Sequence, residues 1–182
     1  MTKVVTGRKT RFSFPNLFVA KANESGDNLK YGICLLIPKE DTATVNAIEK
    51  AIEKAKQLGK EGKWGGSAPR KFESPLRDGD EKAEDGYPEF AGHFYINASS
   101  KLKPAVVDNR REVINEPTEV KAGDYGRASI NFYPYNFQGK KGVAAGLNAV
   151  QKLLDGEPLG SGFSNPNEDF DIEEEYDVDD LM

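Results

Sequence analysis

The chain has little of the chemistry that metal sites and covalent catalysis need. It contains one cysteine, Cys34, and one histidine, His93. A lone cysteine excludes an internal disulfide, and the lack of a Cys/His cluster excludes a zinc site. Cys34 lies within an apolar run, which predicts a buried, inert thiol. His93 lies on an alternating segment near Tyr95 and is predicted to be a structural or rim residue rather than a catalytic base.

Recognisable loops for ions and nucleotides are also missing. Residues 78–82 fail the calcium-loop pattern because Lys82 occupies a ligand position, and residues 139–142 lack the glycine spacing of a phosphate-binding loop. Carboxylates between residues 78 and 85 could hold magnesium as in a nuclease, but a polar loop explains them more simply. We therefore predict a protein that is not an enzyme and has no cofactor and no metal.

Long apolar runs are absent as well. No stretch approaches the roughly 20 residues that cross a bilayer. The first nine residues have no apolar core between their charges, unlike a secretory signal. The chain is therefore expected to be soluble and cytoplasmic.

Positive charge is absent from the C-terminal end. Residues 153–182 contain 11 Asp and Glu and no Lys or Arg, whereas residues 1–152 contain all 25 Lys and Arg and 19 Asp and Glu. Such asymmetry indicates a body that binds a polyanion and a separate interaction tail. We predict a folded domain over residues 1–160 and an acidic, disordered tail over residues 161–182, because a segment that repels itself this strongly does not collapse.

Hydrophobic periodicity in the body is mostly that of strands. An alternating segment starts at Thr10 and is interrupted at Pro15, and residues 29–37 form a nearly continuous apolar strand. Residues 91–98 and 105–107 are predicted as further strands. One helix is predicted, with Pro38 and Asp41 or Thr42 marking its start; it continues as far as Leu58, and Gly59 is its stop. Residues 60–89 have little periodicity and are predicted as a long inserted loop.

The most regular pattern lies between residues 123 and 154. Alternation predicts that Ala128, Ile130 and Phe132 face the core, while Arg127, Ser129, Asn131, Tyr133 and Tyr135 face outward. Residues 138–142 have turn composition, and residues 143–149 then resume a period of two, with Val143, Ala145, Leu147 and Ala149 in phase. This pattern predicts a hairpin with a basic tip.

These elements indicate a small barrel. About five mostly antiparallel strands with one helix and no βαβ alternation exclude a doubly wound sheet. An OB-type barrel fits best, because that scaffold commonly presents a strand face and loops to oligonucleotides. The predicted fold is thus mainly β: a five-stranded OB-type barrel with one helix, a long inserted loop and a disordered acidic tail.

Exposed rings and cations on this barrel predict a surface for unpaired nucleic acid, because bases stack on rings while cations follow the phosphates. The predicted stacking residues are Tyr133, Tyr135, Tyr95 and Trp64. The predicted phosphate contacts are Arg11, Lys101, Lys103, Arg127, Lys140 and Lys141. Two roles stay open for Trp64, which either stacks on a base or plugs the core beneath the loop. The alternative for the tyrosines is cross-strand packing.

Hydrophobic residues spaced among the acids of the tail predict docking to partner proteins. The predicted partner-binding residues are Phe170, Asp177, Asp179, Asp180, Leu181 and Met182. The tail can also compete with nucleic acid for the basic surface, and the two roles can coexist. The simpler alternative is a tail that only solubilises the protein.

Four segments resemble a family of tailed-phage single-stranded DNA-binding proteins. They are residues 75–80, 92–98, 126–135 and 141–148, and their combination in this order is specific. The resemblance implies an OB fold, sequence-tolerant binding of single-stranded DNA, and a role in phage DNA replication and recombination in the host cytoplasm.

The layout is also similar to that of single-stranded DNA-binding proteins whose acidic tails recruit polymerases, helicases, nucleases or recombinases. Those tails commonly end on a phenylalanine, whereas this chain ends on Leu181 and Met182. The predicted function is therefore sequence-independent binding and protection of single-stranded DNA, with partners recruited through the tail. A single-stranded RNA-binding barrel and a protein-interaction module acting through the tail stay open as alternatives, as does assembly into a homodimer.

Overall fold

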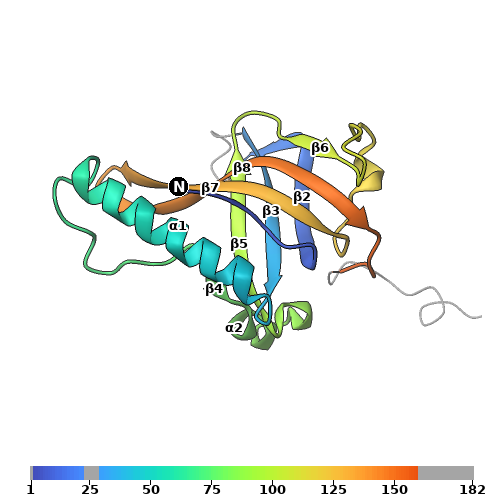
Figure 1. Cartoon of the computed structure of the whole chain (residues 1–182), viewed down its shortest axis with the longest axis horizontal. Coiled ribbons are helices and arrows are strands. Elements are labelled where there is room, and N and C mark those ends of the chain that lie inside the picture. The colour runs from blue at the N-terminus through green and yellow to red at the C-terminus, as the bar shows by residue number, and fades with distance from the viewer. Residues whose placement is uncertain (1, 23–28, 160–182) are drawn as a thin grey trace, which may run out of the picture.

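The computed structural model describes residues 2–22 and 29–159, and its main feature is a closed barrel of five strands. The barrel strands are β2 (Thr10–Ala22), β3 (Leu29–Pro38), β5 (His93–Ser100), β7 (Tyr125–Phe137) and β8 (Lys140–Leu154). They pair in the order β7-β2-β3-β5-β8, and β8 pairs again with β7, which closes the barrel (Figure 1). Only the β5–β8 contact within the barrel is parallel. This architecture confirms the predicted OB-type barrel.

Shorter elements surround the barrel. β1 (Lys3–Val5) extends the sheet beside β7, β4 (Arg77–Asp78) pairs with β5, and β6 (Ala105–Val107) pairs with β8. Besides the main helix α1 (Thr42–Glu61) there is a short helix α2 (Gly79–Glu84) and two 3₁₀ turns, η1 (Pro88–Phe90) and η2 (Pro117–Glu119). The inserted loop therefore contains a second helix and a strand, which its low periodicity had concealed.

Helix α1 begins where the sequence predicts and ends later. The carboxylate of Asp41 caps it by accepting hydrogen bonds from the backbone N–H and the hydroxyl of Thr44. Its buried stripe, which includes Ile48 and Ile52, packs against β7 (Figure 1). The predicted stop at Gly59 is wrong, because the helix continues to Glu61. None of the helices in the described part of the chain is long and apolar enough to cross a membrane.

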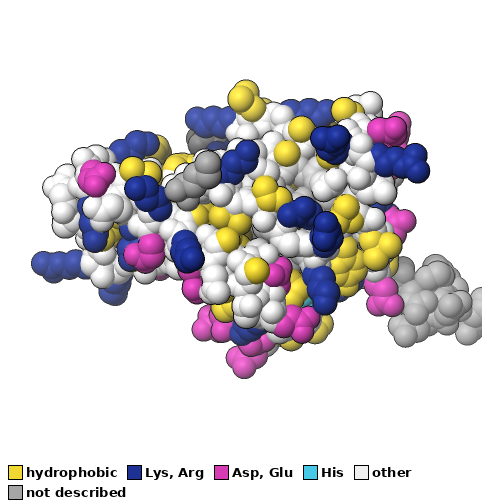
Figure 2. Space-filling view, viewed as in Figure 1, with side chains coloured by type: hydrophobic (Ala, Val, Ile, Leu, Met, Phe, Trp, Pro, Cys, Tyr) yellow, Lys and Arg dark blue, Asp and Glu magenta, His cyan; other side chains and the backbone are white. Residues whose placement is uncertain are grey.

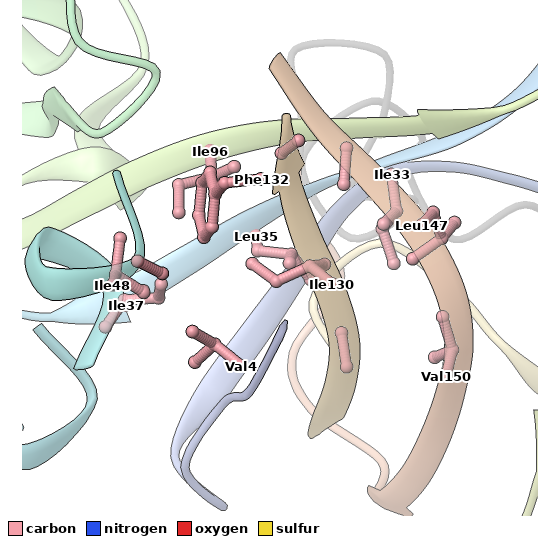
Figure 3. Close-up of a cluster of buried hydrophobic side chains, with 14 of the residues drawn as sticks. Val4, Ile33, Leu35, Ile37, Ile48, Ile96, Ile130, Phe132, Leu147 and Val150 are labelled. Carbon is pink, nitrogen blue, oxygen red and sulfur yellow. The ribbon is translucent and has the colours of Figure 1, made fainter. Parts of the chain in front are cut away.

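The core fills the inside of the barrel and the space beneath α1. Figure 3 shows the side chains of β3 spread along the core, with Ile33 beside Leu147 of β8, Leu35 beside Ile130 of β7 and Ile37 beside Ile48 of α1. The predicted core face of β7 is confirmed, since Ala128, Ile130 and Phe132 are all buried. Alternation along the strand sufficed here because one face of β7 meets the core and the other does not.

The prediction for β8 fails at one residue. Ile130 pairs with Leu147 and Ser129 with Ala149, so Asn148 is an extra residue that has no partner on β7. This β-bulge shifts the phase of the strand, and Val150 takes the core position predicted for Ala149.

A second, smaller cluster lies outside the barrel. Cys34 and Leu36 of β3 are buried there against Phe90. Burial raises the pKa of the Cys34 thiol to about 12, although the nearby Lys82 ammonium acts in the opposite direction. The prediction of a buried, inert thiol is confirmed.

Lys39 anchors α2 to the barrel. Its Nζ lies 2.8 Å from Oδ1 of Asp78 and 2.6 Å from Oδ2 of Asp80. Asp78 also caps α2, and Asp80 accepts a hydrogen bond from the backbone N–H of Gly92. The hydrogen bonds from Lys39 hold the pKa of both carboxyl groups below the usual value of 3.8.

We expect this anchor to make stability depend on pH in the acid range. The carboxyl pKa values are lower in the folded state, so their contribution is present above pH 4 and is lost as pH falls through the lowered values. The gap in unfolding free energy between wild type and Lys39→Met should therefore be larger at pH 7 than at pH 2.5 in urea denaturation. Lys54→Met, on the exposed face of α1, is the control. A gap that does not change with pH would contradict the assignment.

Candidate nucleic-acid interface

The hairpin of β7 and β8 extends beyond the barrel alongside α1 (Figure 1). Its turn is tighter than predicted and consists of Gln138 and Gly139, both with positive φ, at 51° and 84°. Two such residues match the right-handed twist of the flanking strands. Lys140 and Lys141, predicted as turn residues, therefore belong to β8.

Three exposed aromatic residues alternate along the end of β7, and we call them the hairpin strip: Tyr133, Tyr135 and Phe137. Tyr133 and Tyr135 are each 37% exposed and Phe137 is 67% exposed. Tyr135 lies across Gly142 of β8, where an added Cβ would be 2.6 Å from the phenol oxygen. Small residues on the partner strand thus leave the rings open to solvent. Phe137 is not among the predicted stacking residues, although the alternation that indicated Tyr135 continues to it.

Trp64 braces the hairpin from beneath. Its side chain is only 2% exposed, and Nε1 donates a hydrogen bond of 2.9 Å to the backbone oxygen of Tyr135. Lys141 Nζ donates to the backbone oxygen of Trp64, and Asn136 donates to that of Lys63. The burial of the indole contradicts the predicted stacking role of Trp64. The alternative, in which Trp64 plugs the core beneath the loop, agrees with the structure. Lys141, predicted as a phosphate contact, is therefore also part of this brace.

Gly59 makes room for the brace, and we expect its replacement to be destabilising. Alanine in place of glycine within a helix normally stabilises a protein by roughly 0.5–1 kcal/mol. Here the added Cβ would lie 2.6 Å from Cδ2 of Trp64. Gly59→Ala should therefore lower the unfolding free energy by about 1–3 kcal/mol, as overpacked cores do. Lys60→Ala, next to it but exposed, should be nearly neutral in the same urea titration; a stabilised Gly59→Ala protein would contradict the brace.

A groove runs beside the hairpin strip on the outer face of the barrel. Its lining includes Arg77 of β4, Asn97 and Ser99 of β5, and Tyr135 and Ala144 of the hairpin. The floor is made of small residues, since Ser99 of β5 pairs with Gly146 of β8. Arg77 is exposed and adds a positive charge to the groove, although it is not among the predicted phosphate contacts. In OB-type barrels the second and third strands and the loop between the fourth and fifth commonly contact oligonucleotides; here these are β3, β5 and the hairpin tip.

An aromatic arc continues across the same outer face. It consists of Phe14, Tyr87, Phe90 and Tyr95, whose ring centroids are 6.4, 5.9 and 5.2 Å apart in that order. The rings meet edge to face, and Phe90 is buried at the centre. Lys82 Nζ lies 4.9 Å from the ring centre of Tyr87 and 5.9 Å from that of Tyr95. Tyr95, predicted to stack on a base, pairs with Arg77 and so connects the arc to the groove.

The chain is similar to known proteins in sequence and in fold. The family model described as "Enterobacter phage Enc34, ssDNA-binding protein" matches residues 2–182. The chain belongs to the Enc34 family of phage single-stranded DNA-binding proteins. The chain is 34% identical over 171 residues to "Putative protein p50" of Acyrthosiphon pisum secondary endosymbiont phage 1, a match that covers 88% of this chain and 89% of that protein. These matches confirm the resemblance noted from the sequence.

Solved structures of similar proteins share the fold. The single-stranded DNA-binding protein of bacteriophage Enc34 in complex with ssDNA superposes with a TM-score of 0.74 at 30% identity, over 87% of this chain and 90% of that one. The single-stranded DNA-binding protein gp2.5 of bacteriophage T7 superposes with a TM-score of 0.58 at 18% identity, over 97% of both chains. The second likeness concerns the fold alone.

In this member of the Enc34 family, two predicted phosphate contacts lie away from the hairpin strip. Arg11 donates to the backbone oxygens of Gly123 and Glu157 and lies over the ring of Tyr125, so its guanidinium has a structural role. Arg127 donates to the backbone oxygen of Thr6. It precedes Tyr135 by eight residues, roughly 26 Å along a strand. We therefore leave Arg11 and Arg127 out of the candidate interface.

The other predicted cations lie at the edges of the outer face. Lys101 follows the end of β5 and is exposed, and Lys140 is exposed opposite Phe137. Lys103 Nζ lies 5.5 Å from the ring centre of Phe18. Figure 2 shows acidic side chains gathered over α2, with Lys and Arg spread over the rest of the face in view. No group of acidic, histidine and cysteine side chains suited to a metal ion occurs among residues 2–22 and 29–159.

Residues 155–159 form a strap that leads the chain to the outer face. Its first residue, Asp155, accepts hydrogen bonds from Lys121 and Lys152, which lower the pKa of its carboxyl group. Its last residue, Leu159, packs against the cluster around Phe90 and donates a backbone hydrogen bond to Ala122. The predicted partner-binding residues, from Phe170 to Met182, lie outside the described part of the chain.

Proposed function

We propose that this protein binds single-stranded DNA without reading its sequence, along the hairpin strip and the groove beside it. The observation on which the proposal rests is a set of three exposed rings on a hairpin that the buried Trp64 holds in place. Stacking on rings tolerates any sequence because every base has a π-face. Arg77, Lys101 and Lys140 are the cations placed to follow the phosphates.

Family membership supports the same proposal. The similar Enc34 protein is a single-stranded DNA-binding protein whose structure is in complex with ssDNA. We infer that the present protein coats and protects single strands during phage DNA replication and recombination in the host cytoplasm. It does so as a binding protein and catalyses no reaction.

Fluorescence anisotropy of labelled oligo(dT) over a salt series tests the binding. The logarithm of affinity should fall with the logarithm of salt concentration by about 0.7 per phosphate contact, so three contacts give a slope near −2. Lys140→Ala should lower this slope, whereas Lys54→Ala on the exposed face of α1 should not. Absence of binding, or affinity that is independent of salt, would refute the proposal.

Competition separates this proposal from its alternatives. Unlabelled oligo(dT) should displace the labelled strand better than oligo(rU) or a duplex of the same length, and stronger displacement by oligo(rU) would favour an RNA-binding barrel. The bound oligonucleotide should remain intact after incubation with Mg²⁺, since degradation would indicate a nuclease.

We also propose that the acidic tail recruits replication or recombination proteins and competes with DNA for the outer face. The strap supports this idea, because it ends at Leu159 beside the aromatic arc, immediately before the acidic segment. The acidic segment is therefore attached to the chain next to this face, where its carboxylates can compete with DNA phosphates for the same cations.

Deletion of residues 164–182 tests the tail. The shortened protein should bind oligo(dT) more tightly at low salt and should lose its pull-down of host or phage replication proteins. A matched control keeps the tail length but replaces its Asp and Glu with Asn and Gln, which separates charge from chain length. DNA affinity that is unchanged across the salt series would contradict competition, and partner binding by the deleted protein would contradict recruitment.

A further inference from the structure

Phe14 has a backbone conformation that a bulky residue rarely adopts. Its φ is 46°, in the left-handed region, and its side chain is 55% exposed. Alternation along β2 would place it inside the barrel with Phe12, which is fully buried. The irregularity in the pairing of β2 with β3 between Ser13 and Asn16 turns it outward instead. An outlier of this kind is found most often at functional sites.

A packing role does not account for this conformation. The ring that Phe14 meets is Tyr87, at 6.4 Å and edge to face, so one of its faces is open to solvent. The same phenylalanine turned inward would bury far more apolar area. The strain therefore serves to expose the ring rather than to cover the core.

The position of Phe14 relates it to the candidate interface. The aromatic arc begins at Phe14 on β2 and ends at Tyr95, whose strand partner Arg77 lines the groove beside Tyr135. From β2 across β3, β5 and β8 to β7 there are four strand spacings, about 19 Å along the sheet. The floor between the two ends includes the polar residues Asn97 and Ser99 of β5, whereas Ser13 and Cys34 are buried.

We propose that Phe14 and Tyr87 form a second stacking site for nucleobases, so that a bound single strand crosses the outer face from the hairpin strip to β2. Lys82, whose Nζ lies 4.9 Å from the ring centre of Tyr87, adds a positive charge to this site. The inference rests on the proposed function, whose site it extends by a second set of rings. A strand that uses both sites must span the floor, so the second site contributes only to longer oligonucleotides.

Phe14→Gly tests the site, because glycine removes the ring and adopts positive φ without strain. Binding of a long oligo(dT) should weaken by roughly 5- to 150-fold, the loss expected for one stacked base. The melting temperature should stay the same or rise. Phe14→Asn, which also tolerates positive φ, should behave like Phe14→Gly, and Phe14→Tyr should retain binding.

A length series with Tyr135→Ala as reference distinguishes the outcomes. Tyr135→Ala should weaken every oligo(dT) length, whereas Phe14→Gly should spare the shortest strands that bind. Normal affinity of Phe14→Gly for long strands, with Tyr135→Ala impaired, would overturn the second site and leave the proposed function intact. Normal affinity of both variants would overturn both. A matched fall in melting temperature in the Gly and Asn variants, or an equal binding defect on the shortest strands, would also overturn the second site.

Discussion

Replacing Tyr133 and Tyr135 together by alanine is expected to weaken oligo(dT) binding by about 2–6 kcal/mol. Each ring is proposed to stack on one base, an interaction that contributes roughly 1–3 kcal/mol. Both rings are more than a third exposed and lie over small residues of β8. They contribute little to the core, so the melting temperature should change by only a few degrees. Anisotropy with labelled oligo(dT) at fixed salt measures the affinity, and thermal unfolding monitored by circular dichroism measures the stability.

The matched control for this variant is Tyr133→Phe with Tyr135→Phe. It keeps both π-faces and removes only the hydroxyl groups, so its affinity should stay within a few-fold of wild type. If the two double variants lose affinity equally, hydrogen bonding by the phenols and not stacking holds the strand. A double alanine variant that unfolds would show that the rings pack in the fold, which is the alternative that the sequence left open.

Replacing Asp124 by alanine is expected to destabilise the fold by about 3–5 kcal/mol, the usual cost of leaving a buried charge without its partner. The carboxylate of Asp124 is fully buried and lies 3.3 Å from Lys152 Nζ. It also accepts hydrogen bonds from the backbone N–H groups of Lys121 and Gly156. Its loss leaves Lys152 unpaired on that side and removes the hydrogen bond from Gly156 of the strap.

Urea denaturation at neutral pH is the appropriate measurement for Asp124→Ala, because guanidinium salts would screen the ion pair. Asp155→Ala is the control. Asp155 also contacts Lys152, at 2.5 Å, but its side chain is exposed, so its removal should cost far less. Equal destabilisation by the two variants would show that the strap, and not the buried carboxylate, accounts for the effect.

Local periodicity was sufficient wherever a segment meets one environment on each face. β7 is such a segment, because its inner side chains contact the core and its outer ones face solvent. Its alternation therefore predicts which face is buried. The cap of α1 at Asp41 could also be predicted, because capping depends only on residues within one turn of the helix. Periodicity failed where a single residue changed phase, as at Asn148 of β8 and Phe14 of β2.

Candidate site residues were harder to predict than strands, because alternation tells which face a side chain is on and not what lies above it. Trp64 is 71 residues from Tyr135 in the sequence, and only the folded chain brings its indole to that backbone oxygen. The sequence indicates that Arg11 is an exposed surface cation. In the folded protein its guanidinium instead donates hydrogen bonds to the backbone oxygens of Gly123 and Glu157. Arg77 was overlooked because nothing in its neighbours indicates that it lines a groove. Phe137 could have been predicted, because the alternation through Tyr133 and Tyr135 continues to it.

By itself the sequence determined the kind of molecule: a mainly β body with a net positive charge, an acidic C-terminal segment, and a hairpin with aromatic residues on its outer face. These features depend on composition and on periods of a few residues. Only the tertiary structure decided which rings are exposed and which cations are free, because closure of the barrel brings β8 back to β7 and fixes contacts between residues far apart in the chain. The burial of Trp64 and the hydrogen bonds of Arg11 depend on such long-range contacts, so no local pattern encodes them.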